Sequence, residues 1–244
     1  QSLGRFRKEN GFLFEPLSVM VAPTLLPNNF GYPVMAQIDN VLSRADENLP
    51  SSLERLFELV RIKSISTDPV FKADCRKAAE YLVTVLTGLG FEASVRDTAG
   101  HPMVVAHHAG EKADSPHVLF YGHYDVQPVD PIELWETDPF EPSIKEDEKG
   151  RKIITGRGTS DDKGQLLTFV EAVRAYKDVK GALPVRVTIL FEGEEESGSP
   201  SLKPFLQANV EVLRESTVSP QNADETEALL RQTYSIFGSY KDLV

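Results

Sequence analysis

Residues 184–198 have the sequence Pro-Val-Arg-Val-Thr-Ile-Leu-Phe-Glu-Gly-Glu-Glu-Glu-Ser-Gly. Its first eight residues largely alternate apolar and polar side chains, which predicts a strand. A glutamate, a glycine and three more glutamates follow directly, so the predicted strand ends in an acidic loop. Loops at the ends of strands are the usual place for sites in α/β sheets. The stretch therefore predicts both a sheet and a candidate site at its edge.

Two upstream segments repeat this arrangement. Gly122-His123-Tyr124-Asp125 follows the apolar run Val118–Tyr121. Residues 156–164, Gly-Arg-Gly-Thr-Ser-Asp-Asp-Lys-Gly, follow a short predicted strand at 153–154. All three segments lie where a strand gives way to a loop, and we therefore expect them to meet at one edge of the sheet.

The rest of the chain alternates helical and strand patterns. Further strands are predicted at 91–95 and 103–106, and helices are predicted at 51–60, 72–89, after Asp162 and after Ser199-Pro200. The first of these helices is placed by a capping box, Ser51-Ser52-Leu53-Glu54, and residues 129–151, with the charged run 145–149, are predicted to be loop. The pattern predicts an α/β fold with a mixed, mainly parallel sheet sandwiched by helices.

Composition excludes several classes of function. The 244 residues include 26 basic and 37 acidic side chains, a net charge of −11 with no basic stripe, so neither nucleic acid nor an anionic membrane is an expected partner. No apolar run is long enough to span a membrane. The single cysteine, Cys75, excludes an intrachain disulfide, and its helical apolar neighbours predict a buried structural thiol. A reducing, cytoplasmic location is compatible with this cysteine content and is the one we expect.

The residue types in the three segments suit a metal. An imidazole with carboxylates favours Zn²⁺ or Mn²⁺ over Ca²⁺. Three adjacent glutamates, 194–196, repel one another unless solvent or a cation intervenes. Each segment also has a simpler interpretation: His123 as an ordinary loop histidine, Asp161 and Asp162 as helix-capping residues, and the glutamates as a solvated turn.

The three segments together resemble the M20 family of zinc metallopeptidases. Gly-His-Tyr-Asp-Val-Gln-Pro at 122–128 and Phe-Glu-Gly-Glu-Glu-Glu-Ser-Gly-Ser at 191–199 are most similar to its dipeptidase, or carnosinase-like, branch. The resemblance covers about residues 35–207. It implies a zinc-exopeptidase-like catalytic domain that is incomplete in this chain.

Position by position, the resemblance implies roles for five residues. His123 would ligate one metal, Asp161 would bridge two metals, and Glu196 would ligate the second. Glu195 would be the general base, and Asp125 would orient His123. The implied cofactor is a pair of Zn²⁺ ions, with Mn²⁺ or Co²⁺ as alternatives, and the Asp161–Asp162 peptide bond is typically cis in the family.

The implied activity is hydrolysis of the peptide bond of dipeptides or small peptides. An N-acyl-amino-acid deacylase or desuccinylase with the same metal chemistry is the alternative enzyme, and a non-catalytic fragment is the alternative of another class. Full-length family members are often homodimeric, which leaves the oligomeric state of this chain open.

The chain departs from the family pattern towards both ends. Residues 1–34 are predicted to be a poorly structured extension, 35–207 a portion of the catalytic domain, and 208–244 a divergent segment. The family's later carboxylate and histidine ligands and its lid domain have no counterpart here, so we expect a truncated chain. Asp224 is interpreted as part of a helix start rather than as a ligand.

Overall fold

A four-stranded sheet forms the centre of the fold. The computed structural model describes residues 12–13 and 33–210, and the order of strands in the main sheet is β2-β3-β7-β4. The strands span β2 (Glu92–Arg96), β3 (Met103–His108), β4 (His117–His123) and β7 (Arg186–Glu192). The helices span α1 (Pro33–Arg61), α2 (Lys72–Gly88), α3 (Lys163–Lys180) and α4 (Leu202–Ala208).

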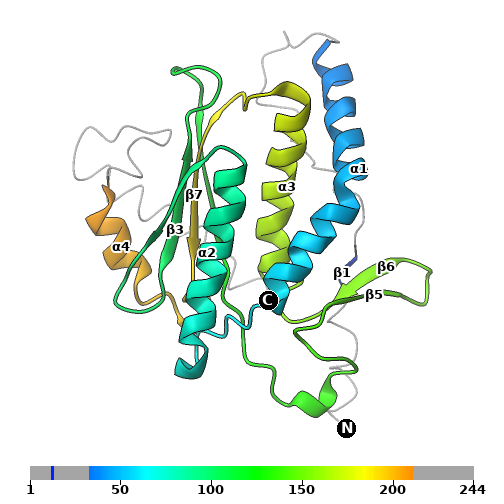
Figure 1. Cartoon of the computed structure of the whole chain (residues 1–244), viewed down its shortest axis with the longest axis vertical. Coiled ribbons are helices and arrows are strands. Elements are labelled where there is room, and N and C mark those ends of the chain that lie inside the picture. The colour runs from blue at the N-terminus through cyan, green and yellow to red at the C-terminus, as the bar shows by residue number, and fades with distance from the viewer. Residues whose placement is uncertain (1–11, 14–32, 211–244) are drawn as a thin grey trace, which may run out of the picture.

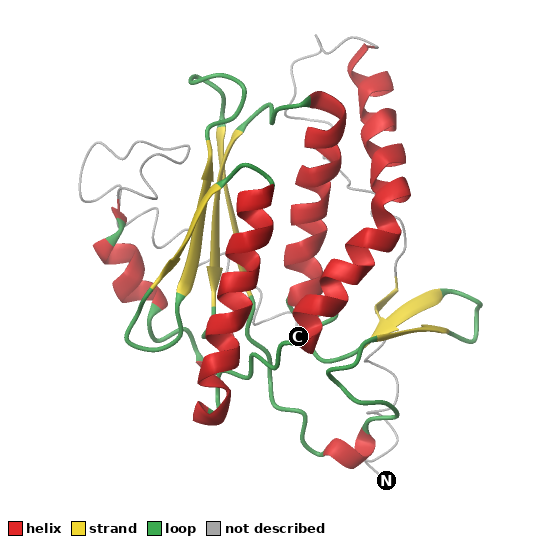
Figure 2. Ribbon diagram, in the orientation of Figure 1, coloured by secondary structure: helices red, strands yellow, loops and turns green. Residues whose placement is uncertain are grey.

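Helices cover both faces of this sheet (Figures 1 and 2). The larger core lies between the sheet and α1, α2 and α3, and it includes fully buried Leu82, Leu166 and Ile189. A smaller cluster joins the opposite face of the sheet to α4 through Leu190 and Phe205. The predicted α/β sandwich is confirmed, and Cys75 is buried on α2 as expected.

The sheet is mixed, but the described strands are not mainly parallel. β4 pairs with β7 in parallel, whereas β2 with β3 and β3 with β7 are antiparallel. The prediction of a mainly parallel sheet was therefore wrong for this part of the chain. Only six residues, 97–102, join β2 to β3, and a connection that short is too brief for a parallel crossover. The longer segment from β4 to β7 contains α3 and makes the parallel crossover.

Helix α1 begins well before the predicted capping box. The box at Ser51-Ser52 lies inside the helix, where both hydroxyls bond back to the carbonyl of Asn48, at 2.9 and 3.1 Å, instead of capping a new helix. Pro50 lies within the same helix and lacks a backbone N–H, which accounts for the change of direction in α1 (Figure 1).

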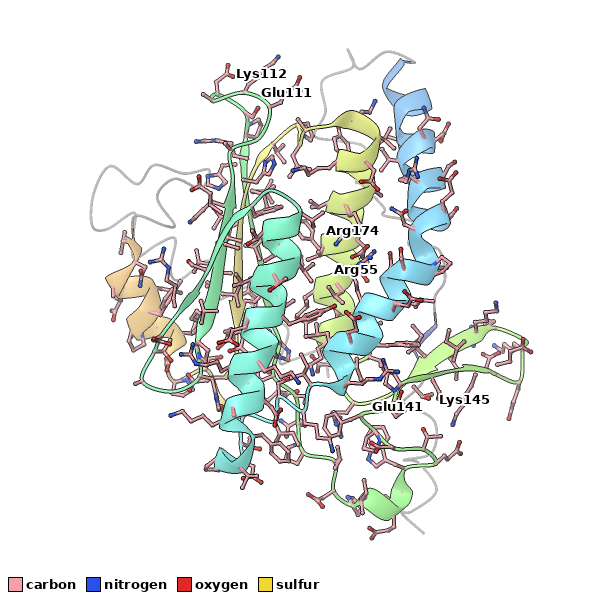
Figure 3. All side chains as sticks on the ribbon, viewed as in Figure 1. Arg55, Glu111, Lys112, Glu141, Lys145 and Arg174 are labelled. Atoms are coloured by element: carbon pink, nitrogen blue, oxygen red, sulfur yellow. The ribbon has the colours of Figure 1, made fainter. Side chains whose placement is uncertain are left out.

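A polar cluster fastens α1 to α3. Arg55 Nε donates to Glu171 Oε1 at 2.7 Å, and Arg174 on α3 also contacts Glu171, at 3.1 Å. Figure 3 shows Arg55 and Arg174 between the two helices. This cluster fixes the end of α1 relative to α3, and both elements flank the candidate site.

A second, antiparallel sheet stands apart from the first (Figure 1). It comprises β1 (Phe12–Leu13), β6 (Lys152–Thr155) and β5 (Ser143–Glu146). The prediction that 145–149 is loop was wrong for Lys145 and Glu146, which pair with β6 because the turn at 147–150 folds β5 onto it. Lys145 also contacts Glu136 at 3.0 Å.

The end segments of the chain fall largely outside the described residues. This applies to most of the predicted extension 1–34, to most of 208–244 and to Asp224. Helix α4 exists as predicted but begins at Leu202 after Ser201, two positions beyond the expected proline start. Within 12–13 and 33–210, no helix combines the length and apolarity needed to cross a membrane.

Candidate metal centre

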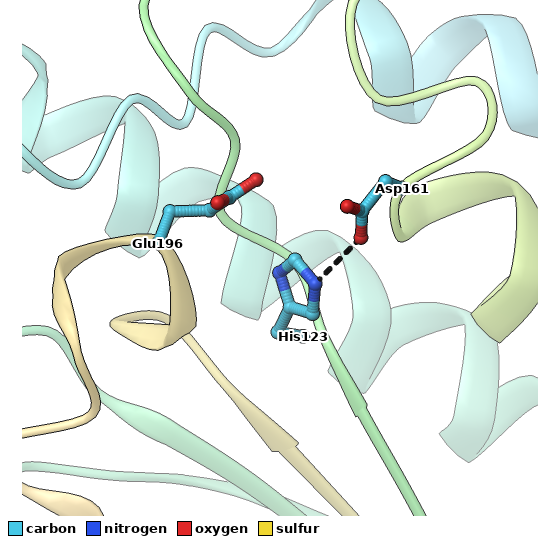
Figure 4. Close-up of side chains that lie close together, drawn as sticks. All are labelled: His123, Asp161 and Glu196. Carbon is cyan, nitrogen blue, oxygen red and sulfur yellow. Dashed lines mark hydrogen bonds and ion pairs between the residues drawn. The ribbon is translucent and has the colours of Figure 1, made fainter. Parts of the chain in front are cut away.

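The three polar segments meet at the carboxyl ends of β4 and β7. His123 is the last residue of β4 and is the register partner of Glu192 at the end of β7. Asp161 lies two residues before α3, and Glu196 lies in the short helix η4 (Glu195–Ser197). One ligand atom from each of His123, Asp161 and Glu196 lies within 4.8 Å of the other two (Figure 4). The convergence expected from the sequence is therefore present.

The His123 ring is held between two carboxylates. Its Nδ1 lies 3.3 Å from Asp125 Oδ1, and its Nε2 lies 3.0 Å from Asp161 Oδ1. Burial lowers the pKa of His123, but the hydrogen bonds to Asp125 and Asp161 outweigh it and raise the pKa to about 11. Without a cation, the imidazole therefore carries a proton that offsets part of the surrounding negative charge.

Asp125 joins the segment that contains His123 to the segment that contains Glu195 and Glu196. Its side chain is fully buried, and it accepts the backbone N–H groups of Glu195 at 3.2 Å and Glu196 at 3.1 Å. One carboxylate thus sets the position of His123 and of the two glutamates together.

The two adjacent aspartates have different surroundings. Their peptide bond is cis, as the family resemblance implies. Asp161 has a largely exposed side chain, and its hydrogen bond with His123 lowers its pKa. Asp162 turns inward and accepts the backbone N–H of His123 at 3.0 Å, and burial raises its pKa to about 6. The structure therefore separates one open aspartate from one that supports the His123 backbone.

Glu195 and Glu196 are both half-buried beside the histidine. Glu195 Oε2 lies 4.0 Å from His123 Nε2. Glu196 Oε2 accepts a hydrogen bond from Gln127 Nε2 at 2.7 Å, and burial raises the pKa of Glu196. The same loop thus offers two carboxylates: that of Glu195 lies near the imidazole, and that of Glu196 is held by the amide of Gln127.

Lys163 plays a part that the sequence did not indicate. It is fully buried and donates to the carbonyls of Leu59 at 3.1 Å and Ile62 at 2.6 Å. Carbonyls at a helix end lack partners within the helix, and a lysine is suited to fill that need. Burial lowers the pKa of Lys163 to about 7.

Arg157 links the aspartate segment to the loop after Asp125. Its Nη2 donates to the carbonyl of Pro128 at 2.9 Å, and its guanidinium lies 5.1 Å from the centre of the Trp135 ring. Asp161 and Glu196 are close enough to raise its pKa, although burial outweighs them and lowers it. No sequence pattern predicted a role for Arg157, because its contacts are with residues that only the fold brings near.

The donor set fits a divalent metal. One imidazole and several carboxylates converge, and these are ligands that Zn²⁺ and similar ions accept. The carboxylates of Asp161, Glu195 and Glu196 share a single imidazole, so a cation would relieve their mutual repulsion. The roles of these residues in metal binding stay predictions.

Comparison with known proteins shows what the chain is similar to. Residues 119–230 match the model of peptidase family M20/M25/M40. The Cys-Gly metallodipeptidase of Schizosaccharomyces pombe is 33% identical over 183 residues, which are 71% of this chain and 38% of that protein. The human Beta-Ala-His dipeptidase is 29% identical over 187 residues, 72% of this chain and 36% of that protein.

A solved structure shows the same likeness in three dimensions. The crystal structure of human carnosine dipeptidase 1 matches with a TM-score of 0.66 and 28% identity over 74% of this chain and 39% of that one. The chain thus spans less than two fifths of the length of these relatives. The matches to the family model, to the relatives and to the solved structure together place this chain, across residues 119–230, in the M20 peptidase family.

Proposed function

We propose that the chain carries the metal-binding part of a metallodipeptidase that hydrolyses dipeptides or small peptides. The observation that carries the proposal is the convergence of His123, Asp161 and Glu196 within 4.8 Å at the carboxyl edge of the sheet. The names of the relatives, Cys-Gly metallodipeptidase and Beta-Ala-His dipeptidase, support a short peptide as the substrate.

We assign the residues as the family resemblance implies. His123 would hold one Zn²⁺, Glu196 a second, and Asp161 both, with Mn²⁺ or Co²⁺ able to replace zinc. A bound metal supplies Lewis-acid chemistry, polarising the scissile carbonyl and lowering the pKa of water. Glu195, close to His123 and half-exposed, takes a proton from the attacking water. Asp125 keeps Nε2 of His123 aimed at the site through its contact with Nδ1.

The same site chemistry suits an N-acyl-amino-acid deacylase or desuccinylase, because both the dipeptidase and the deacylase cleave an amide bond.

A specific observation favours a non-catalytic alternative for the chain by itself. Among the described residues, each proposed metal has only two protein ligands, one of them shared, whereas catalytic zinc typically has three. We therefore expect the isolated 244-residue chain to bind Zn²⁺ weakly and not to hydrolyse dipeptides.

Zinc binding tests the metal centre directly. The chain is titrated with Zn²⁺ against a chromophoric chelator, beside Asp161→Asn and the matched control Asp114→Asn, whose side chain is exposed on a distant loop. We expect affinity to fall about tenfold or more in Asp161→Asn and to stay unchanged in the control. Equal affinity in all three proteins would refute the site.

Hydrolysis tests the substrate class. The protein encoded by the complete gene is assayed with Cys-Gly, β-Ala-His and an N-acetylated amino acid as substrates. Turnover confined to the dipeptides supports the proposal, and turnover of the N-acyl substrate alone favours the deacylase. Tight binding of two zinc ions and dipeptide turnover by the 244-residue chain itself would contradict the expected incompleteness of the metal site.

We also propose a cytoplasmic location. The buried, unpaired Cys75 is compatible with it, and cell fractionation tests it.

A further inference from the structure

The three consecutive glutamates differ in burial. Glu195 and Glu196 are half-buried on the open side of the site, whereas Glu194 is only 4% exposed. A buried carboxylate costs free energy unless hydrogen bonds compensate for the lost water. The surroundings of Glu194 therefore indicate what it does.

Both carboxylate oxygens of Glu194 accept backbone N–H groups. Oε1 accepts the N–H of His101 at 3.0 Å, and Oε2 accepts the N–H of Ser201 at 3.0 Å. His101 lies in the loop between β2 and β3, and Ser201 immediately precedes α4. One side chain thus joins its own loop and the nearby start of α4 to a loop 93 residues earlier in the sequence.

The backbone of Glu194 forms the turn that carries the next two glutamates. Its carbonyl accepts the N–H groups of Ser197 at 3.1 Å and Ser199 at 2.8 Å. From the other side, Asp125 holds the N–H groups of Glu195 and Glu196. The loop is therefore fixed at two places, by Asp125 beneath it and by Glu194 at its start.

The loop between β2 and β3 is shaped around this carboxylate. A Cβ atom at Gly100 would lie 1.6 Å from Glu194 Oε1 and 2.6 Å from its carboxyl carbon. No side chain fits there while Glu194 keeps its position. Gly100 is thus required by the close approach of Glu194.

We propose that Glu194 is a positioning residue that holds Glu195 and Glu196 in place by binding the backbone of the β2–β3 loop and the start of α4. The inference rests on the proposed function of those two glutamates. Glu194 itself stands apart from the metal-binding group, because both of its oxygens are already occupied by backbone donors.

Hydrogen exchange tests the contact without any metal. The variants are Glu194→Ala and Gly100→Ala, with Glu148→Ala, an exposed glutamate, and Gly88→Ala, where a Cβ meets nothing within 4 Å, as matched controls. Amides of the segment 194–201 should exchange about tenfold faster or more in the two variants and at the wild-type rate in the controls. Unchanged exchange in Glu194→Ala would overturn the proposal.

A double variant shows whether Gly100 and Glu194 act through the same contact. In Glu194→Ala the obstacle to a Cβ at position 100 is gone, so adding Gly100→Ala should change nothing further. Independent, additive effects would contradict a shared contact. Glu194→Gln, which keeps one acceptor oxygen, should recover part of the protection and serves as the conservative rescue.

Co²⁺ binding separates positioning from a merely structural role. For protein shown to be folded, Glu194→Ala should bind Co²⁺ about 10–100-fold more weakly and shift its visible absorption bands, because the ligand Glu196 is displaced. Wild-type affinity and spectrum in folded Glu194→Ala would overturn the positioning role. Failure of the wild-type chain to bind Co²⁺ would count against the proposed metal centre, while hydrogen exchange still decides the Glu194 contact.

Discussion

Two groups of ionisable side chains on the same loops contrast sharply. The anchoring residues, Asp125, Lys163 and Glu194, are at most 4% exposed, and each binds backbone N–H or carbonyl groups of another segment. The open carboxylates, Asp161, Glu195 and Glu196, are half-buried or exposed and gather around one imidazole. Neighbouring residues of one motif therefore have different tasks. One group fixes the loops, and the other is held where its charges repel unless a cation arrives.

Removing an anchoring residue should have the largest effect on stability. Asp125→Ala leaves the N–H groups of Glu195 and Glu196 without their acceptor and removes the partner of His123. We expect the free energy of unfolding to fall by about 3–5 kcal/mol, which urea titration measures. Asp114→Asn, on an exposed side chain, is the control, and an equal, small change in both variants would end the distinction between the two groups.

An incomplete anchor should make stability depend on pH. Glu192 is fully buried, accepts hydrogen bonds from Tyr121 and Ser199, and has one oxygen, Oε2, without a partner among the described residues. Burial raises its pKa from 4.5 to about 7. Between these values the folded state holds more protons than the unfolded state, so this group makes stability fall as pH rises from about 4.5 to about 7.

The difference between the two pKa values corresponds to at most about 3 kcal/mol. Glu192→Gln should remove this pH dependence, so the gap in unfolding free energy between pH 4.5 and pH 8 should narrow relative to wild type. Urea titrations at both values measure it, with Glu148→Gln as the exposed control. An identical gap in Glu192→Gln and wild type would show that folding does not raise the pKa of Glu192.

Removing an open carboxylate should change the free energy of unfolding little and the affinity for metal strongly. Glu196→Gln removes a charge near Asp161 and Asp125, so we expect the free energy of unfolding without metal to change by no more than about 0.5 kcal/mol. Zinc affinity should fall about tenfold or more, because a proposed ligand is lost. A large destabilisation without metal would move Glu196 into the anchoring group.

Glu195→Gln should have the smallest effect on both the free energy of unfolding and the affinity for zinc. It removes a proposed base but no ligand, and the backbone N–H that Asp125 accepts remains. In the protein encoded by the complete gene, hydrolysis should fall by about 10²–10⁴, with metal content and unfolding unchanged. Loss of metal in this variant would mean that the roles of Glu195 and Glu196 are exchanged.

The sequence predicted elements well where they are local. The alternating pattern ending at Phe191 and the helix after Asp162 both depend on residues close together in the chain, and the structure contains them as β7 and α3. The segments that contain His123, Asp161 and Glu196 were singled out because each was predicted to begin where a strand ends, and the roles of the three residues came from the family resemblance. Strand direction was missed, because pairing partners lie far away in the sequence.

The anchoring contacts could not be predicted from a sequence pattern either, because their partners are also far away in the sequence. Lys163 binds carbonyls 101 and 104 residues away, and Glu194 accepts an N–H 93 residues away. The local interpretation of Glu194, as one of three glutamates in a solvated turn, therefore missed its burial. The start of α1 was misplaced because Ser51-Ser52-Leu53-Glu54 has the pattern of a capping box, although it lies inside a longer helix.

The position of Trp135 gives the molecule its own optical reporter. It is the only tryptophan in the sequence, and its indole lies against Arg157. Arg157 is two residues after the end of the β5–β6 pairing and four before Asp161. Its Nε1 also donates to the carbonyl of Val129 at 2.9 Å, on the loop that follows Asp125. All tryptophan emission from the chain therefore originates where the segment that contains Asp161 contacts the segment that contains His123. A rearrangement of either segment is readable as a change in fluorescence, without any label.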